Sequence, residues 1–222
     1  MTFGDYVAEK TIALVGPAKP VGDQSAEIEA HDLVYRLGFI DAIPAEYGTR
    51  TDIALLNSRA TRTLYDDEWY EHHRHYWNVP WLIMKTSQGM RRQGNYRKAS
   101  KPPHVRNPNQ ATLALYDLLQ HHPGPSHITV YGVDLYSSGP VGFYHDNYLN
   151  FAHTISKLGD LSVHATAFLG HRPWEQMRLH RAVHATGRVV GDDRYLAAVT
   201  MTDDEYQAVI DRWKAVLEEA NA

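Results

Sequence analysis

Short apolar runs alternate with helix-like patterns along the chain, at the spacing expected of βα units. The apolar runs predict strands over residues 11–15, 33–37, 52–56, 81–84 and 128–133. The helix-like patterns predict helices over residues 23–30, 64–73, 109–121, 147–158, 173–185 and 203–220. This order favours a single Rossmann-like α/β domain over residues 1–222, in which a mostly parallel sheet carries helices on both faces. Ligands of such sheets bind beyond the carboxyl ends of the strands, so the loops after Val15 and Val133 are the first candidate sites.

The composition limits the chemistry without choosing it. The 222 residues include no cysteine, which excludes disulfides, thiolate catalysis and cysteine-ligated zinc. The formal net charge is −4, and no apolar run approaches the length of a membrane-spanning helix. The first ten residues lack the charged-then-apolar pattern of a secretion signal. We therefore expect a cytoplasmic protein without a membrane anchor.

The segment 13–51 carries the most specific pattern. A Val-Gly pair ending at Gly16 is followed by G-x-x-x-x-E-I-(acidic)-x-H-D-x-V-x-R, which ends at Arg36, and then by G-T-(basic)-T. This pattern resembles the large sialyl motif of the animal-type sialyltransferases, which in that family holds the cytidine monophosphate part of CMP-sialic acid. The resemblance implies nucleotide contacts at Gly16, Pro17 and Arg36. Pro17 and Gly38 stand where the family has asparagines.

The glycine-bracketed turn 16–22 has a second interpretation. It matches neither G-x-G-x-x-G nor G-x-x-x-x-G-K-[ST], which argues against a dinucleotide or P-loop site. As a purely structural turn, its glycine supplies a positive φ and Asp23 caps the next helix. Glu29, His31 and Asp32 are then capping groups and solvated charges. The pattern alone leaves both interpretations open.

A second group of residues spans a proline-started helix and the strand after it, over residues 107–135. It resembles the small sialyl motif, to which the family assigns donor and acceptor contacts. Where the family has Pro-Ser/Thr-Ser/Thr-Gly, this chain has Pro-Asn-Gln-Ala-Thr. The implied contact residues are Asn109, Gln110, Thr112, Tyr131, Gly132 and Asp134. At a helix N-terminus such side chains donate hydrogen bonds where the dipole favours an anion, or they are ordinary helix-start residues.

Two further family motifs have counterparts that supply catalytic candidates. Phe143-Tyr144-His145-Asp146 resembles the third motif, with Phe143 in place of its histidine, so Tyr144 or His145 is expected to stabilise the leaving phosphate. Asp146 is equally well placed to cap a helix. His171, which opens a helix together with Glu175, resembles the very small motif and is the candidate general base. The helix dipole there disfavours the protonated imidazole, and Glu175 orients the ring or bonds the helix amides.

The charge distribution adds a feature that owes nothing to resemblance. From His72 to Tyr116 there is no Asp or Glu. The same stretch contains eight positive residues, Arg74, Lys85, Arg91, Arg92, Arg97, Lys98, Lys101 and Arg106. We predict an irregular basic insertion at about 85–108. It is a solvated loop, a polyanion or acceptor site through Arg91, Arg92, Arg97 and Lys98, or a charged lid over the nucleotide.

Through these motifs the chain resembles the sialyltransferases, and we expect a sialyltransferase-like glycosyltransferase of the variant GT-A type. The resemblance implies a nucleotide-sugar donor linked to CMP and an inverting, metal-independent displacement that needs no cofactor. The acceptor is a glycan or a hydroxylated base in viral DNA. The alternative is a non-catalytic nucleotide- or nucleic-acid-binding module. His72, His73 and His75 could bind a metal but fit a solvated helix end better, and no metal is expected.

Overall fold

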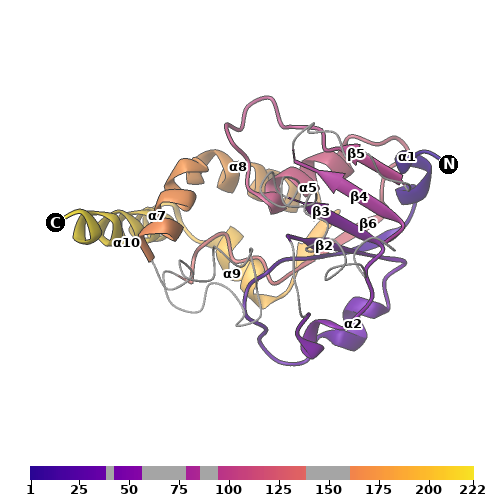
Figure 1. The fold of residues 1–222 in the computed structure, drawn as a ribbon, viewed down its shortest axis with the longest axis horizontal. Coiled ribbons are helices and arrows are strands. Elements are labelled where there is room, and N and C mark those ends of the chain that lie inside the picture. The colour runs from indigo at the N-terminus through magenta and orange to yellow at the C-terminus, as the bar shows by residue number, and fades with distance from the viewer. Residues whose placement is uncertain (39–42, 57–78, 86–94, 139–160) are drawn as a thin grey trace, which may run out of the picture.

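The computed structural model describes residues 1–38, 43–56, 79–85, 95–138 and 161–222, with side chains from 165 onward in the last range (Figure 1). The described strands form one seven-stranded sheet in the order β5-β4-β3-β2-β1-β6-β7, and every pairing between them is parallel. The strands are β1 (Thr11–Val15), β2 (Leu33–Leu37), β3 (Ile53–Leu56), β4 (Trp81–Met84), β5 (Asn95–Lys98), β6 (His127–Tyr131) and β7 (Val189–Gly191). The helices are α1 (Phe3–Val7), α2 (Ser25–Glu29), η1 (Ala45–Tyr47), α5 (Gln110–Leu119), α7 (Leu161–Gly170), α8 (Pro173–His184), α9 (Asp193–Thr200) and α10 (Asp203–Asn221). The chain is a single Rossmann-like α/β domain.

The strand order creates a topological switch point at β1. From β1 the chain builds outward through β2, β3, β4 and β5, and it then returns to place β6 on the other side of β1. The connections after β1 and β6 therefore leave the sheet in opposite directions, which opens a crevice between them at the carboxyl edge. The predicted parallel sheet is confirmed, and its switch point is the natural place for a ligand.

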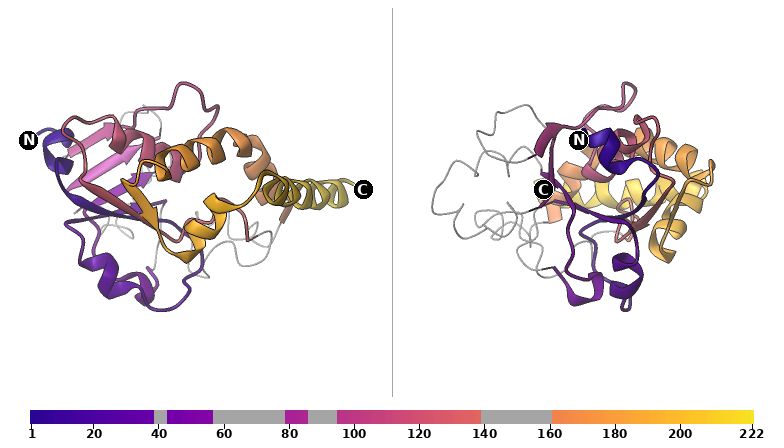
Figure 2. Two further views of the ribbon diagram at one scale, coloured as in Figure 1. Left: turned by 180° about the vertical axis from the view of Figure 1, so that it is seen from behind. Right: turned by 90° about the vertical axis from the view of Figure 1, so that its right-hand side faces the viewer.

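Both faces of the sheet are covered because the central strands are apolar on both sides, as is usual for parallel strands. Leu14 and Tyr35 belong to the larger core cluster, which includes the buried face of α5. Val15 and Val34 belong to a smaller cluster with Ile28 of α2. Figures 1 and 2 show α2 away from α5, α7, α8 and α10, and it contacts the short helix η1.

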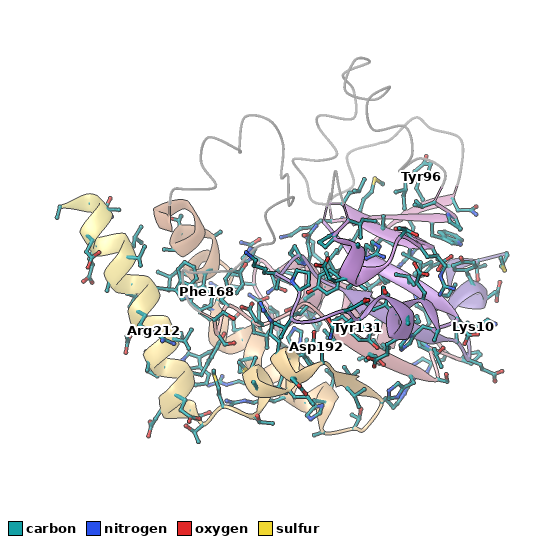
Figure 3. The ribbon with its side chains drawn as sticks, turned by 90° about the horizontal axis from the view of Figure 1, so that it is seen from below. Lys10, Tyr96, Tyr131, Phe168, Asp192 and Arg212 are labelled. Carbon is teal, nitrogen blue, oxygen red and sulfur yellow. The ribbon has the colours of Figure 1, made fainter. Side chains whose placement is uncertain are left out.

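The C-terminal helices extend the larger core beyond the sheet edge. Trp213 of α10 is fully buried, and its ring centroid lies 5.6 Å from that of Phe168 on α7. Figure 3 shows Phe168 directed toward α10, whose C-terminal end points away from the sheet in Figures 1 and 2. A capping box between Thr202 and Glu205 starts α10. Helix α10 therefore packs against α7.

The predicted strands over 11–15, 33–37 and 81–84 match the observed ones, and the one over 52–56 begins one residue later. The strand predicted over 128–133 ends at Tyr131, because Gly132 turns the chain with a φ of +59°. The predicted helices over 23–30, 109–121, 173–185 and 203–220 correspond to α2, α5, α8 and α10. Those predicted over 64–73 and 147–158 lie outside the described residues.

The basic segment at about 85–108 was predicted to be irregular, and this was wrong in part. Residues Asn95–Lys98 pair with β4 as the edge strand β5. Its residues are polar, and Tyr96 is 42% exposed at the sheet edge in Figure 3. An exposed edge strand is held by backbone hydrogen bonds to one neighbour and buries few side chains, so its sequence need not alternate between apolar and polar residues. Charged residues on such a strand oppose the addition of a further strand. The sequence pattern therefore missed it.

Arg97 of β5 is committed to an internal ion pair. Its Nη1 and Nη2 lie 2.5 and 2.8 Å from the two carboxylate oxygens of Asp117, whose side chain is fully buried. The backbone N–H of Ser100 donates to the same carboxylate at 2.6 Å. The guanidinium also lies 4.8 Å from the centroid of the Phe3 ring. Arg97 therefore ties β5 to α5 and α1, whereas its neighbour Lys98 is exposed.

Replacing Arg97 with Met should lower the free energy of unfolding by about 3 kcal/mol or more, because it leaves the Asp117 carboxylate buried without its partner. Lys98→Met, on the same strand but exposed, is the matched control and should change stability by about 0.5 kcal/mol or less. Urea unfolding followed by circular dichroism measures both. Equal effects of the two substitutions would contradict the structural role of Arg97.

Candidate nucleotide site

A pocket of about 70 Å³ lies at the switch point. This is room for a few water molecules. Four segments form it: the loop after β1, the end of β2, the loop after β6 and the first turn of α5. Its lining residues are Pro17, Ala18, Leu37, Asn109, Gln110, Ala111, Gly132, Val133, Asp134, Leu135 and Tyr136. The pocket therefore brings together Pro17, Asn109, Gln110, Gly132 and Asp134 from the two predicted motifs, although more than ninety residues separate them in sequence.

The floor of the pocket depends on two glycines that touch. A Cβ atom on Gly16 would lie 2.4 Å from the carbonyl oxygen of Gly132, closer than any side chain tolerates. The Gly16 N–H donates to the carbonyl of Tyr131 at 2.7 Å, and the Ala18 N–H donates to that of Gly132 at 3.0 Å. The pairing of β1 with β6 thus continues into both loops. Only glycine fits at position 16, because the backbone of Gly132 approaches too closely for a Cβ atom.

Side chains from both faces of the sheet hold these loops. Asp192, the N-cap of α9, accepts a hydrogen bond from the Gly132 N–H at 2.8 Å and lies next to Tyr131 in Figure 3. From the other face, the Tyr47 hydroxyl donates to the carbonyl of Ala18 at 2.9 Å. A Cβ on Gly132 would meet that hydroxyl at 2.5 Å. The pocket wall is therefore fixed before any ligand binds.

The first turn of α5 presents backbone N–H groups to the pocket. Asn109 caps the helix, and its side chain accepts from the Thr112 N–H at 2.8 Å. The N–H groups of Gln110 and Ala111 have no acceptor among the described residues, and both residues line the pocket. The positive end of the helix dipole lies at the same place. This end of the pocket favours an anion.

His171 lies close to this turn and is held in one tautomer. Its Nδ1 is 2.6 Å from the carbonyl oxygen of Asn107, two residues before the pocket-lining Asn109. A carbonyl only accepts, so Nδ1 carries the proton and Nε2 keeps a free lone pair. Burial lowers the pKa of His171, the Asn107 carbonyl opposes this, and the Lys85 charge adds to the lowering. The ring is therefore neutral at pH 7, as a general base must be.

The backbone around His171 is held in uncommon conformations. Asn107 and Arg172 have φ values of +47° and +57°, in the left-handed region that non-glycine residues rarely adopt. Residues in such conformations cluster at functional sites. Glu175 was expected to orient the imidazole or bond helix amides, but it accepts from the Arg106 N–H at 2.8 Å. The Asn107 carbonyl orients the ring instead, because the loop before α5 passes beside α8.

Gln176 joins the two helix starts and was not identified from the sequence. Its buried carbonyl oxygen accepts from the Asn109 N–H at 2.9 Å and from the Thr112 hydroxyl at 2.7 Å. Its amide donates to the carbonyl of His171. The available signal was the pair Gln176 and His180, two polar residues four apart on the buried stripe of α8. Gln176 fixes the base relative to the pocket.

Lys85 is a second functional candidate that the motif comparison did not identify. It follows β4, and its N–H donates to the carbonyl of Leu56 at 3.0 Å. Burial, reinforced by the positive charge of Lys101, lowers the pKa of Lys85 to about 8. Its charge also acts on His171. The carboxyl edge near His171 is therefore positive.

Four predicted contact residues are absent from the pocket lining: Gly16, which contacts Gly132, and three residues with internal partners. Arg36 is 2% exposed, and its guanidinium donates to the carbonyls of Arg50 and Tyr47 at 3.0 and 2.9 Å. The Tyr131 hydroxyl donates to Glu27 of α2 at 2.8 Å. The Thr112 side chain is buried between α5 and α8. All three have internal partners that the sequence motifs did not reveal.

Other predictions fall where the structure gives no description or only a limited one. Tyr144, His145, Arg91 and Arg92 lie outside the described residues, as does the histidine cluster at 72–75. Within the described ranges, no group of three or more His, Asp or Glu residues could hold a metal ion. None of the described helices combines the length and apolarity of a membrane span.

The chain was compared with protein-family models and with curated proteins, and neither comparison found a match. A function for this site must therefore be argued from its own residues and their geometry.

A buried histidine next to the site makes stability depend on pH. His180 is fully buried, with Nε2 3.1 Å from the Thr112 hydroxyl and Nδ1 3.2 Å from that of Tyr195. Burial lowers its pKa to about 3. Between that value and the unfolded value of 6.5, the unfolded chain binds the extra proton. The contribution of neutral His180 to the free energy of unfolding is therefore complete above pH 6.5. Below that pH the contribution falls by about 1.4 kcal/mol per pH unit.

We expect the free energy of unfolding of the wild type, measured with urea, to fall by at least this slope between pH 6 and 5, and His180→Gln to reduce the slope by about 1.4 kcal/mol per pH unit. Comparing the slopes isolates His180 from other titrating groups. An unchanged slope in the variant would refute the assignment.

Proposed function

We propose that this protein is a sialyltransferase-like glycosyltransferase that binds the nucleotide of a CMP-activated sugar at the switch-point pocket. The observation that carries the proposal is the meeting of the two motif-like segments at one pocket, with His171 held neutral beside it. Sequence separation alone would not bring Pro17, Gly132 and Asn109 together. A glycosyltransferase needs such a nucleotide site together with a base.

The donor phosphate binds at the first turn of α5 in this proposal. The N–H groups of Gln110 and Ala111 and the helix dipole stabilise its negative charge, which grows as the bond to the sugar breaks. Lys85 adds a positive charge at the same edge of the sheet. In this proposal these groups take the role that the resemblance assigns to the histidine of the third motif, where this chain has Phe143. Tyr144 and His145 stay predictions for the same role.

His171 acts as the general base in a single displacement. The acceptor hydroxyl oxygen attacks the anomeric carbon while its proton passes to Nε2 of His171. The bond between the anomeric carbon and the phosphate oxygen breaks, and CMP leaves with the electron pair. Attack opposite the leaving group inverts the anomeric centre. The Nδ1–H bond to the Asn107 carbonyl stabilises the imidazolium that forms.

The acceptor is proposed to be a glycan or a hydroxylated base in DNA. Tyr96 and Lys98 are exposed together on the edge strand β5, which is the combination that stacks on bases and contacts phosphates. Arg97 is not available for this role because it pairs with Asp117. Phe143, in place of the family histidine, favours the alternative of a non-catalytic nucleotide-binding module.

A thermal-shift series with CMP, CDP, UMP, UDP and GDP tests the nucleotide site. CMP at 100 times its dissociation constant should stabilise the folded protein by about 2.7 kcal/mol, which raises the melting temperature by several degrees. Uridine and guanosine nucleotides should have smaller effects. Stabilisation by UDP or GDP but not by CMP would exclude a CMP-linked donor.

His171→Gln should reduce the release of CMP from CMP-sialic acid by about 100-fold or more, because activation of the attacking hydroxyl is lost. Its melting-temperature shift with CMP should be unchanged. His184→Gln, at the C-terminal end of α8 and with Nδ1 2.9 Å from the carbonyl of Val189, is the matched control. Full activity of the His171→Gln variant would show that His171 is not the catalytic base. No CMP release by the wild type would favour the non-catalytic module.

A further inference from the structure

Asp134 places an unused carboxylate oxygen at the pocket. The residue is 3% exposed and lines the pocket just after β6. Its Oδ1 accepts from the Tyr136 N–H at 2.9 Å. Its buried Oδ2 has no hydrogen-bond partner among the described residues. A buried acceptor without a partner destabilises the fold, so native structures rarely keep one without a function.

The turn that follows Asp134 has a strained backbone conformation, and this conformation sets the position of Asp134. Leu135 and Tyr136 have φ values of +49° and +67°, a conformation that is strained for non-glycine residues. Side chains of α10 bind both carbonyls. The Trp213 indole N–H donates to the carbonyl of Tyr136 at 3.2 Å, and the Tyr206 hydroxyl reaches that of Leu135 at 3.5 Å. Helix α10 therefore stabilises the strained backbone conformation of this turn.

The pocket thus has two polar features of opposite sign. The first turn of α5 offers the free N–H groups of Gln110 and Ala111 and favours an anion. Asp134 offers an acceptor and disfavours an anion. A ligand that satisfies both has a phosphate at one end and a hydrogen-bond donor at the other. The ribose 5-phosphate unit of a nucleotide has this pattern, because its hydroxyls lie across the sugar ring from the phosphate.

We propose that Asp134 Oδ2 accepts a hydrogen bond from a ribose hydroxyl of the bound nucleotide and thereby makes the site selective for ribonucleotides over deoxyribonucleotides. This inference rests on the proposed function, since it requires a nucleotide in the pocket. Carboxylates serve the same purpose in dinucleotide folds, where an acid beyond another strand binds ribose hydroxyls. The volume of about 70 Å³ is small against the usual ligand pocket, so only the part of the nucleotide that carries the hydroxyl enters it and the rest lies outside.

Isothermal titration with CMP, 2′-deoxy-CMP and 3′-deoxy-CMP tests the inference on the wild-type protein. Loss of the hydroxyl bound by Asp134 should weaken binding by about 10-fold or more, as expected for a hydrogen bond to a charged acceptor. The other deoxy analogue should bind within a few-fold of CMP. Equal affinities for all three overturn the role of Asp134 but leave a nucleotide site in place. Failure of every nucleotide to bind overturns the proposed function as well.

Asp134→Asn completes a double-mutant comparison. It should weaken CMP about 10-fold and leave the affinity for the discriminated deoxy analogue nearly unchanged, because the lost interaction is already absent there. Asp193→Asn, an exposed acid in the first turn of α9, is the control and should bind all three ligands like the wild type. An equal loss for CMP and for the deoxy analogue would show that Asp134 only maintains the turn, which overturns the inference.

Discussion

The close contact between Gly16 and Gly132 is the constraint on which the candidate site depends. Parallel pairing of β1 with β6 ends with Val15 opposite Tyr131, and the next residues must separate to leave a crevice at the switch point. They first touch, with room for no side chain at either position, and then diverge. Because the two loops are fixed against each other, the residues that follow them line one pocket. The two motif-like segments meet there for this reason.

A hydrogen-bond network then sets the position of the base relative to that pocket. Gln176 binds the start of α5 through Asn109 and Thr112, and it binds the carbonyl of His171. The Asn107 carbonyl fixes the imidazole tautomer. Burial keeps the same ring neutral. The packing of α8 against the loop that precedes α5 thus sets both the position of the His171 ring and its protonation state.

The residues of the motif-like segment 13–51 have mainly internal partners in this chain. Glu29 accepts from the Thr49 N–H at 2.7 Å, Asp32 accepts from the Thr11 N–H at 2.8 Å, and Arg36 binds loop carbonyls. These contacts close the loops that join β1, β2 and β3. A sequence pattern can therefore persist because the fold requires it, while different residues line the pocket. Gly16, Pro17 and Arg36 of this segment were expected to contact the nucleotide, and only Pro17 is in the pocket wall.

The sequence by itself determined the fold class and the bounds of strands such as β1 and β4, because runs of apolar residues must be buried wherever they lie. It also identified the segments that form the pocket. It did not determine the partners of polar side chains. Arg97 in a basic stretch pairs with Asp117, and Asn107 orients His171 where Glu175 was expected. Apolar burial depends on each residue and its near neighbours, whereas a hydrogen bond depends on which distant segments the tertiary structure brings within 3 Å. Only the tertiary structure could therefore assign these pairs and leave one oxygen of Asp134 available to a ligand.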